Sequence, residues 1–292
     1  MSLFFQTLID GLRLGSIYAL IALGYTMVYG IAKMLNFAHG DVIMIGAYTI
    51  IVTVMSLNIP PVISILISIL FCALLGMTIE FLAYKPLRKA SPLAVLITAI
   101  GVSYFLQNIA LLLFGSESKK FPRIFSLPSI KLGGVNIDGI TIITLSLTAV
   151  IMIVLTLFIS KTKIGKAMRA VSEDKEAAEL MGISTNRTIT VTFAIGSALA
   201  AIASTFYGAT YTFVVPTTGA MPGIKAFTAA VFGGIGSVPG AMLGGILLGI
   251  IEQFSNAYIS TSMSNAIVFA ALIIVLLVKP TGLLGKKISE KV

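Results

Sequence analysis

Residues 161–187 read KTKIGKAMRAVSEDKEAAELMGISTNR and form a charged segment in a chain that is otherwise apolar enough for lipid. Ser172 is a favourable N-cap residue, and Glu173 and Asp174 follow it where the helix dipole favours negative charge. Gly182 can adopt the left-handed conformation that ends a helix. Helical spacing groups four residues on one side: Ala177, Ala178, Leu180 and Met181. A simple connection between membrane spans needs no such helix, so we expect a docking surface for a cytoplasmic partner.

Hydrophobic residues make up 57% of the 292 residues, charged residues 11%, and the mean hydropathy is +1.04. Soluble domains usually carry about 25% charged residues, so this composition is typical of an integral membrane protein. The net charge of +9 could suggest a nucleic-acid partner, but the basic residues interrupt apolar runs and form no continuous stripe. Membrane orientation explains them better. The single cysteine, Cys72, excludes a disulfide or a CxxC metal framework within the chain.

Apolar runs recur along the chain, and a spanning helix needs about 20 mostly apolar residues. The first run carries Arg13, continues to about Ile31 and lacks a cleavage site, so we interpret it as a retained span rather than a signal peptide. The predicted fold is an all-α, polytopic transmembrane helical bundle, forming one transmembrane domain over 1–292, with spans near 7–31, 41–57, 62–84, 92–114, 140–160, 188–213, 239–257 and 263–278. The Gly-rich segment 222–236 either crosses or re-enters, which makes eight or nine spans.

The basic residues predict which end of the bundle faces the cytoplasm. Suppose that the N-terminus lies outside and that 222–236 crosses the membrane. Then 14 of the 20 Lys and Arg residues lie inside: Lys33 and those of the 85–89 loop, the charged segment and the C-terminal tail. The residues left outside are Arg13, Lys119, Lys120, Arg123, Lys131 and Lys225. The opposite orientation would reverse this ratio. We therefore place the charged segment in the cytoplasm and the 115–139 loop outside.

The chain offers no set of residues for catalysis. One histidine and one cysteine cannot supply a nucleophile, a base and an orienting group, nor a multi-histidine metal site. No GxxxxGK[ST] motif occurs, because Gly165–Lys166 is followed by Ala167. The longest polar stretch is under 30 residues, shorter than the roughly 40 residues that an unassisted fold needs. We expect no enzyme activity and no cofactor in this chain, so any ATP-driven work belongs to another chain.

Two interrupted apolar segments, 32–46 and 216–240, point to a substrate path near the middle of the membrane. The first carries three polar side chains: Asn36, His39 and Asp41. They could hold an unwound backbone that lines the pathway, or they could cap a short cytoplasmic turn. In the second segment the candidate pathway positions are Gly233, Gly234 and Gly236.

Small residues four apart let helix backbones approach closely in lipid. The pairs with this spacing are Gly11–Gly15, Gly240–Gly244 and Gly245–Gly249. We expect them to mark helix–helix contacts.

Ionisable and amide side chains inside spans are costly, so each should have a partner. Glu80 is expected to pair with Lys85 or Arg88 near the end of its span. Glu252 could pair with a neighbouring helix or line a cavity. The remaining two, Gln107 and Asn108, are expected to bond across helices.

Three blocks of the sequence carry a family resemblance: 11–48 (GLRLGSIYALIALGYTMVYGIAKMLNFAHGDVIMIGAY), 165–183 (GKAMRAVSEDKEAAELMGI) and 223–249 (GIKAFTAAVFGGIGSVPGAMLGGILLG). They resemble the permease subunits of bacterial branched-chain amino acid ABC transporters, of the H-subunit type. The resemblance covers essentially the whole chain. It implies the cytoplasmic (inner) membrane, a second homologous permease, two cytoplasmic ATPases that use ATP, and an extracytoplasmic binding protein that delivers leucine, isoleucine or valine.

In permeases of this family, an EAA-type cytoplasmic loop couples the membrane subunit to the ATPase. The matching Glu, Ala, Ala and Gly fall here within the charged segment. With the neighbouring apolar residues, the coupling positions that the resemblance implies are Glu176, Ala177, Ala178, Leu180, Met181 and Gly182.

Three other functions remain open. A urea or short-chain amide ABC permease shares the same blocks. An ion-coupled secondary transporter would need a carboxylate at mid-membrane, for which Glu252 is the plausible candidate. A membrane enzyme would need clustered catalytic groups.

Overall fold

The computed structural model describes residues 2–88, 90–125, 128–132 and 134–285. Within these ranges, seven helices are long and apolar enough to cross a membrane. Strands in the same ranges form only two short antiparallel pairs. The predicted all-α membrane bundle is confirmed. Lys89 and the tail from Lys286, which the orientation argument used, lie outside the described residues.

The first half of the chain forms four helices: α1 (Ser2–Ala32), α2 (His39–Ile51), α3 (Pro61–Ile79) and α4 (Pro92–Phe114). A π-helical turn extends α2 (Val52–Ser56), and a π turn and a 3₁₀ turn extend α3 (Glu80–Tyr84 and Lys85–Leu87). The second half forms α5 (Gly139–Lys161), α6 (Lys163–Glu173), α7 (Lys175–Leu180), α8 (Thr185–Tyr211), α9 (Ala220–Gly233), α10 (Val238–Tyr258) and α11 (Ser264–Val278). The strand pairs are β1 (Lys119–Lys120) with β4 (Phe213–Val214), and β2 (Ile130–Leu132) with β3 (Val135–Ile137).

The predicted spans correspond to these helices one by one. Seven are the long helices, counting α2 and α3 with their extensions. The remaining two are α9 and α11, which have 14 and 15 residues and fall short of the usual span of about 20.

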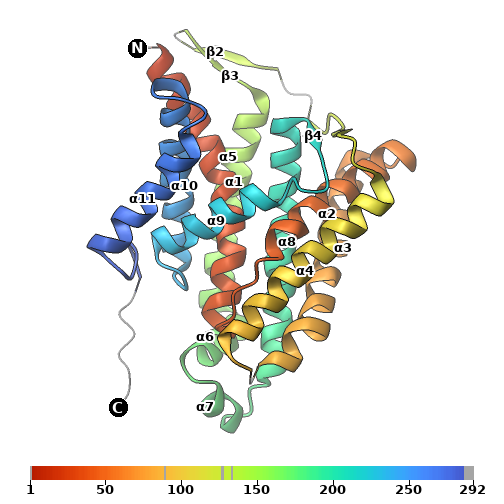
Figure 1. Ribbon diagram of the computed structural model, residues 1–292, viewed down its shortest axis with the longest axis vertical. Coiled ribbons are helices and arrows are strands. Elements are labelled where there is room, and N and C mark those ends of the chain that lie inside the picture. The colour runs from red at the N-terminus through yellow and green to blue at the C-terminus, as the bar shows by residue number, and fades with distance from the viewer. Residues whose placement is uncertain (1, 89, 126–127, 133, 286–292) are drawn as a thin grey trace.

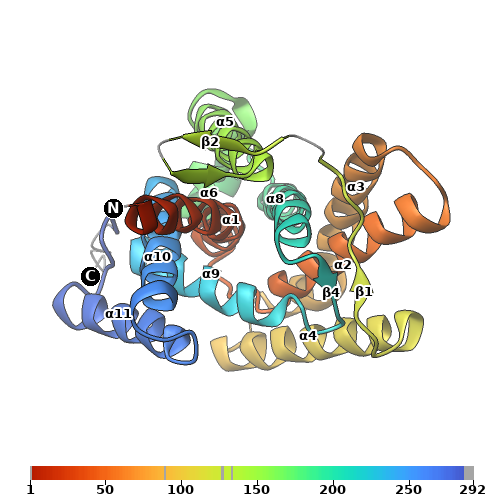
Figure 2. The same cartoon turned by 90° about the horizontal axis from the view of Figure 1, so that it is seen from above.

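Helix α1 is the central column of the bundle, enclosed by α5, α8, α9 and α10 (Figure 2). In the most apolar 18-residue stretch of α1, 94% of the residues are buried inside the protein, whereas in the corresponding stretch of α5 only 17% are buried. The peripheral helices α3, α4 and α5 instead expose many aliphatic and aromatic side chains, as lipid-facing helices do.

Glycines allow α1 and α10 to pack backbone to backbone. A Cβ atom on Gly11 would lie 2.9 Å from the Cα atom of Ile250, and one on Gly15 would lie 2.7 Å from that of Ile246. On the facing helix, a Cβ atom on Gly245 would meet the backbone of Ala19. The predicted close packing at these glycines is therefore confirmed, because no larger residue fits without moving a helix.

Helices α2 and α9 both begin inside the bundle rather than at a surface (Figure 1). Their first turns touch through Gly40 and Gly219, where a Cβ atom on either residue would meet the other's backbone. The interrupted segments predicted at 32–46 and 216–240 thus meet each other in the fold.

The two ends of the bundle are chemically different (Figure 1). The charged helices α6 and α7 lie at one end, beside the end of α1. The β2–β3 hairpin and the β1–β4 pair lie at the other end, with the start of α1. This separation agrees with the opposite locations predicted for the charged segment and the 115–139 loop.

Replacing Gly245 tests the central helix contact. Gly245→Ala should destabilise the protein by about 1–3 kcal/mol, because the added methyl forces α10 away from α1. Thermal unfolding in detergent measures the change. Gly101→Ala on α4 is the control, since nothing lies within 4 Å of a Cβ atom there. Equal stability of the two variants would contradict this packing argument.

Cysteine labelling tests the orientation. In a Cys72→Ser background, Lys120→Cys should react with a membrane-impermeant thiol reagent in intact cells, and Lys163→Cys only after permeabilisation. Both lysines are exposed. Lys120 belongs to β1, which pairs with β4, and Lys163 begins α6; β4 and α6 lie at opposite ends of the bundle (Figure 1). Labelling of both positions from the same side would overturn the orientation.

Candidate functional site

The charged segment folds as two helices with a break at Asp174, not as one helix capped by Ser172. The Asp174 carboxylate accepts hydrogen bonds of 3.0 Å from the amides of Glu176 and Ala177, so it is the N-cap of α7. Ser172 lies within α6, and its hydroxyl donates to the Arg169 carbonyl. The capping prediction was wrong because Asp174, extended at φ −154°, is better placed to accept from α7.

Helix α7 presents a small apolar surface to solvent. Leu180 and Met181 are 90% and 82% exposed, and Ala177 is exposed beside them. Ala178 is buried, so its predicted place on the same face is wrong: one residue further along, a helix turns by about 100°. Gly182 ends the helix at φ +80°, as predicted.

Lys175 connects this surface to the membrane bundle. Its Nζ atom donates a 2.9 Å hydrogen bond to the carbonyl oxygen of Ala32, the last residue of α1. A cation suits the C-terminal end of a helix, where the last carbonyls lack partners. Burial, together with the charges of Arg88 and Lys33, lowers the pKa of Lys175.

The loop after α1 is the first interrupted segment, and it is buried. Asn36, His39 and Asp41 are 3%, 1% and 1% exposed, so the alternative of a solvated cytoplasmic turn is not observed. The Tyr84 hydroxyl donates to the Asn36 side-chain oxygen at 2.9 Å and to the Leu35 carbonyl at 3.4 Å. These bonds satisfy part of the unwound backbone from a neighbouring helix.

His39 and Asp41 begin α2 and contact different neighbours. The His39 ring packs edge-on against Tyr25, with centroids 4.7 Å apart. The Gln107 amide on α4 donates to Asp41 Oδ1 at 2.9 Å, so the predicted cross-helix bond of Gln107 is confirmed. Asn108 donates instead to the Tyr104 carbonyl one turn back on its own helix, so its predicted cross-helix bond is wrong.

Glu80 is fully buried and pairs with Arg88, one of its two predicted partners. The Thr190 hydroxyl on α8 donates to its second carboxylate oxygen at 2.7 Å, and Arg88 also donates to Asn186. This network ties the end of α3 to the start of α8 beside the charged segment.

Glu252 pairs with neighbouring helices, which decides between the two roles left open for it. Its carboxylate accepts from Lys225 Nζ at 2.6 Å and from the Tyr18 hydroxyl at 2.9 Å. Lys225 is only 8% exposed inside α9, so it lies within the bundle and not in a solvated loop. The three groups join α1, α9 and α10 within the bundle.

The candidate pathway glycines lie in the turn between α9 and α10. Gly234 and Gly236 have φ angles of +109° and +92°, which only glycine adopts easily. A Cβ atom on Gly233 would meet Gly240, and Gly30 approaches Gly236. The amides of Leu283 and Leu284 donate to the carbonyls of Phe232 and Gly233. These contacts are structural, and a role in lining the pathway stays a prediction.

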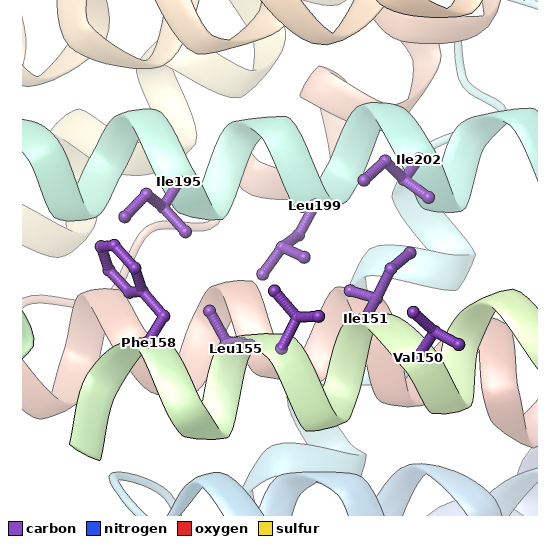
Figure 3. Close-up of a pocket in the computed structure, with 8 residues that line it drawn as sticks. Val150, Ile151, Leu155, Phe158, Ile195, Leu199 and Ile202 are labelled. Atoms are coloured by element: carbon purple, nitrogen blue, oxygen red, sulfur yellow. The ribbon is translucent and has the colours of Figure 1, made fainter. Parts of the chain in front are cut away.

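An apolar groove of about 340 Å³ lies between α5 and α8 (Figure 3). Its lining is entirely aliphatic or aromatic: Val150, Ile151, Val154, Leu155, Phe158, Ile195, Leu199 and Ile202. Such a surface fits hydrocarbon but holds no group that could orient a substrate or bind a cofactor. Among the described residues, no three His, Cys, Asp or Glu side chains gather as metal ligands.

Sequence reasoning missed Lys175, Tyr84 and Tyr18, which supply the contacts of the broken loop and of Glu252. Lys175 belongs to a charged stretch and the tyrosines to apolar runs. No spacing in the chain links any of them to its distant partner.

Residues 7–276 match the family model described as the branched-chain amino acid transport system / permease component. The protein is 45% identical to the high-affinity branched-chain amino acid permease BraD of Pseudomonas aeruginosa, over 99% of this chain and 98% of that protein. Identity to LivH of Escherichia coli is also 45%, with the same coverage. A probable LivH of Methanocaldococcus jannaschii is 28% identical, over 92% of this chain and 89% of that one. The chain is therefore a multi-pass membrane protein that belongs to the branched-chain amino acid transport permease family.

Proposed function

We propose that this protein is the membrane-spanning permease subunit of an ABC importer for leucine, isoleucine and valine in the bacterial inner membrane. An extracytoplasmic binding protein delivers the substrate, and a second homologous permease completes the channel. Two cytoplasmic subunits hydrolyse the ATP. The 45% identity to full-length relatives named as high-affinity branched-chain amino acid permeases supports this substrate.

The observation that carries the coupling part of the proposal is the bond between Lys175 and Ala32. Helix α7 offers Leu180 and Met181 as an apolar contact for an ATPase groove. Lys175, at the start of the same helix, holds the end of α1. A displacement of α7 therefore acts directly on the loop that leads into α2.

The loop is held from two sides, which makes it responsive to relative motion. Lys175 holds its beginning at Ala32, and Tyr84 holds its middle at Asn36. Tyr84 belongs to the extension of α3, which is fastened to α8 through Glu80. A displacement of α7 changes the separation of the two anchors, and the start of α2 moves with them.

Uptake by the assembled complex tests the function. Proteoliposomes that contain this permease, its partner subunits and the binding protein should accumulate radiolabelled leucine only when ATP is present on the ATPase side. Urea should not accumulate. Uptake of urea in place of leucine would favour the short-amide permease, and leucine uptake driven by an ion gradient without ATP would favour a secondary transporter.

Lys175→Met tests the coupling route. Leucine uptake should fall about tenfold, because one hydrogen bond from a charged group is lost. The ATPase subunits should still co-purify, because Leu180 and Met181 remain. The matched control is Lys163→Met, since Lys163 is exposed on α6 and its side chain makes no hydrogen bond or ion pair with any described residue. Unchanged uptake with Lys175→Met, or an equal loss in the control, would refute this route.

A further inference from the structure

Two amide side chains lie on α4 where lipid would be expected. Gln107 is seven residues before the end of the helix at Phe114, about 10 Å at 1.5 Å per residue. Asn108 beside it is exposed. Tyr104, one turn before Asn108, is 63% exposed. Polar groups at membrane depth usually face a water-filled cavity or another protein surface, so this side of α4 does not face lipid.

The amides line an open groove of about 470 Å³, within the roughly 300–1,000 Å³ typical of small-molecule sites. One wall is the end of α4, and the other is the chain just before α9. The lining is mixed in character: Gln107, Asn108, Leu111, Ser116, Val215, Pro216 and Thr217. The groove lies at the same end of the bundle as the β1–β4 pair, which is the end opposite α6 and α7 (Figure 1).

Hydrogen bonds orient both amides. The Gln107 Nε2 atom donates to Asp41 Oδ1 at 2.9 Å and to Ser103 Oγ at 3.3 Å, which uses both of its hydrogens. The Asn108 Nδ2 atom donates to the Tyr104 carbonyl. No described residue donates to the oxygen atom of either amide. Each amide therefore has a carbonyl oxygen available to accept a hydrogen bond.

Carbonyl oxygens recognise a cation such as an ammonium group. Donating to the Asp41 carboxylate polarises the Gln107 amide and makes its oxygen a stronger acceptor. Asp41 itself is buried and touches no solute directly. Its negative charge thus reaches the groove through Gln107, and attracts a cation without forming an ion pair that would trap it.

We propose that this groove binds the ammonium group of an aliphatic amino acid as the substrate passes from the external end of the bundle. The inference rests on the proposed function and identifies where that substrate is first held. The carbonyl oxygens of Gln107 and Asn108 accept from the ammonium group, and the hydroxyls of Ser116 and Thr217 suit the carboxylate. The apolar lining at Leu111, Val215 and Pro216 contacts the aliphatic side chain.

The inner end of the groove leads to the junction of the two interrupted segments. Gln107 contacts Asp41 in the first turn of α2, and the next residue back, Gly40, touches Gly219 before α9. Any motion of α2 that starts at the α1–α2 loop moves Asp41 and therefore Gln107. Release from the groove is thereby linked to the same segment that Lys175 holds.

Thiol labelling tests whether the groove is open to water and favours cations. In a Cys72→Ser background, Asn108→Cys and Thr217→Cys place thiols in the groove, and Phe105→Cys places one outside it at nearly the same depth. The groove thiols should react with a membrane-impermeant cationic reagent about tenfold faster than position 105, because thiolates form in water and not in lipid. They should also react faster with the cationic reagent than with an anionic one.

Adding Asp41→Asn should remove this charge preference at position 108 while leaving the thiol reactive. A merely structural role of Asp41 would not change the ratio of the two rates. Unreactive thiols at 108 and 217, or thiols that cross-link to the second permease, would overturn the proposal, since protein would then cover the groove.

Uptake measurements test the binding role separately. Asn108→Leu, which leaves the Asp41–Gln107 bond intact, and Gln107→Met should each lower leucine uptake by the assembled complex about tenfold. Phe105→Leu should leave uptake unchanged. If the unsubstituted complex takes up leucine and both groove variants do so equally well, this inference fails and the proposed function stands. If the unsubstituted complex takes up no leucine, both fail.

Discussion

The structure depends on hiding two interrupted helices from lipid. Each backbone amide or carbonyl that loses its helical partner in hydrocarbon costs several kcal/mol unless another group satisfies it. Helix α2 begins inside the bundle after the loop that follows Ala32, and α9 begins after a second interruption that follows Tyr211. The first turns of both helices can be enclosed beside α1 only if the helices pack very closely. Glycines at the α1–α10 interface and at the Gly40–Gly219 contact make that approach sterically possible.

Buried ion pairs hold the helices around these breaks. Glu80 and Arg88 pair at the end of α3 and reach α8 through Thr190 and Asn186. Lys225 and Glu252 join α9 to α10, and Tyr18 adds α1. A buried pair contributes little net stability, but removal of one partner leaves an uncompensated charge and costs about 3–5 kcal/mol. These pairs therefore specify which helices are neighbours. The α1–α2 loop is held more lightly, by neutral hydrogen bonds and one lysine, and is the segment best suited to move.

This division matches what a transport pathway requires. A conduit has to attract its substrate and also release it, so strong ligands along the path would slow transport. The buried charges at Glu80 and Glu252 are each neutralised by a cation of the protein itself. At the groove beside α4, the Asp41 carboxylate accepts a hydrogen bond from the Gln107 amide. Under the proposed function, selectivity can reside largely in the binding protein, while the permease supplies a weak polar surface.

Much of the fold could be predicted from the sequence because hydrophobic length and small-residue spacing are local properties. The seven long spans, the charged segment at one end of the bundle, the packing at Gly245 and the Glu80–Arg88 pair all follow from residues near one another or from composition. The break at Asp174 and the burial of Ala178 could not be predicted in this way. Neighbouring residues have nearly equal capping and helix propensities, so tertiary packing decides between them.

The candidate site was predicted only as a set of segments. The sequence indicates that 32–46 and 216–240 are interrupted, but a hydrogen-bond partner can lie 143 residues away along the chain, as Lys175 and Ala32 show. Hydropathy and residue spacing predict a membrane bundle with one charged segment and two broken spans. The three-dimensional packing is needed to show that Lys175 meets Ala32, that Lys225 meets Glu252, and that Gln107 bonds to Asp41 at the edge of an open groove. A hydrogen bond between distant residues depends on how whole helices pack, and no local pattern encodes that geometry.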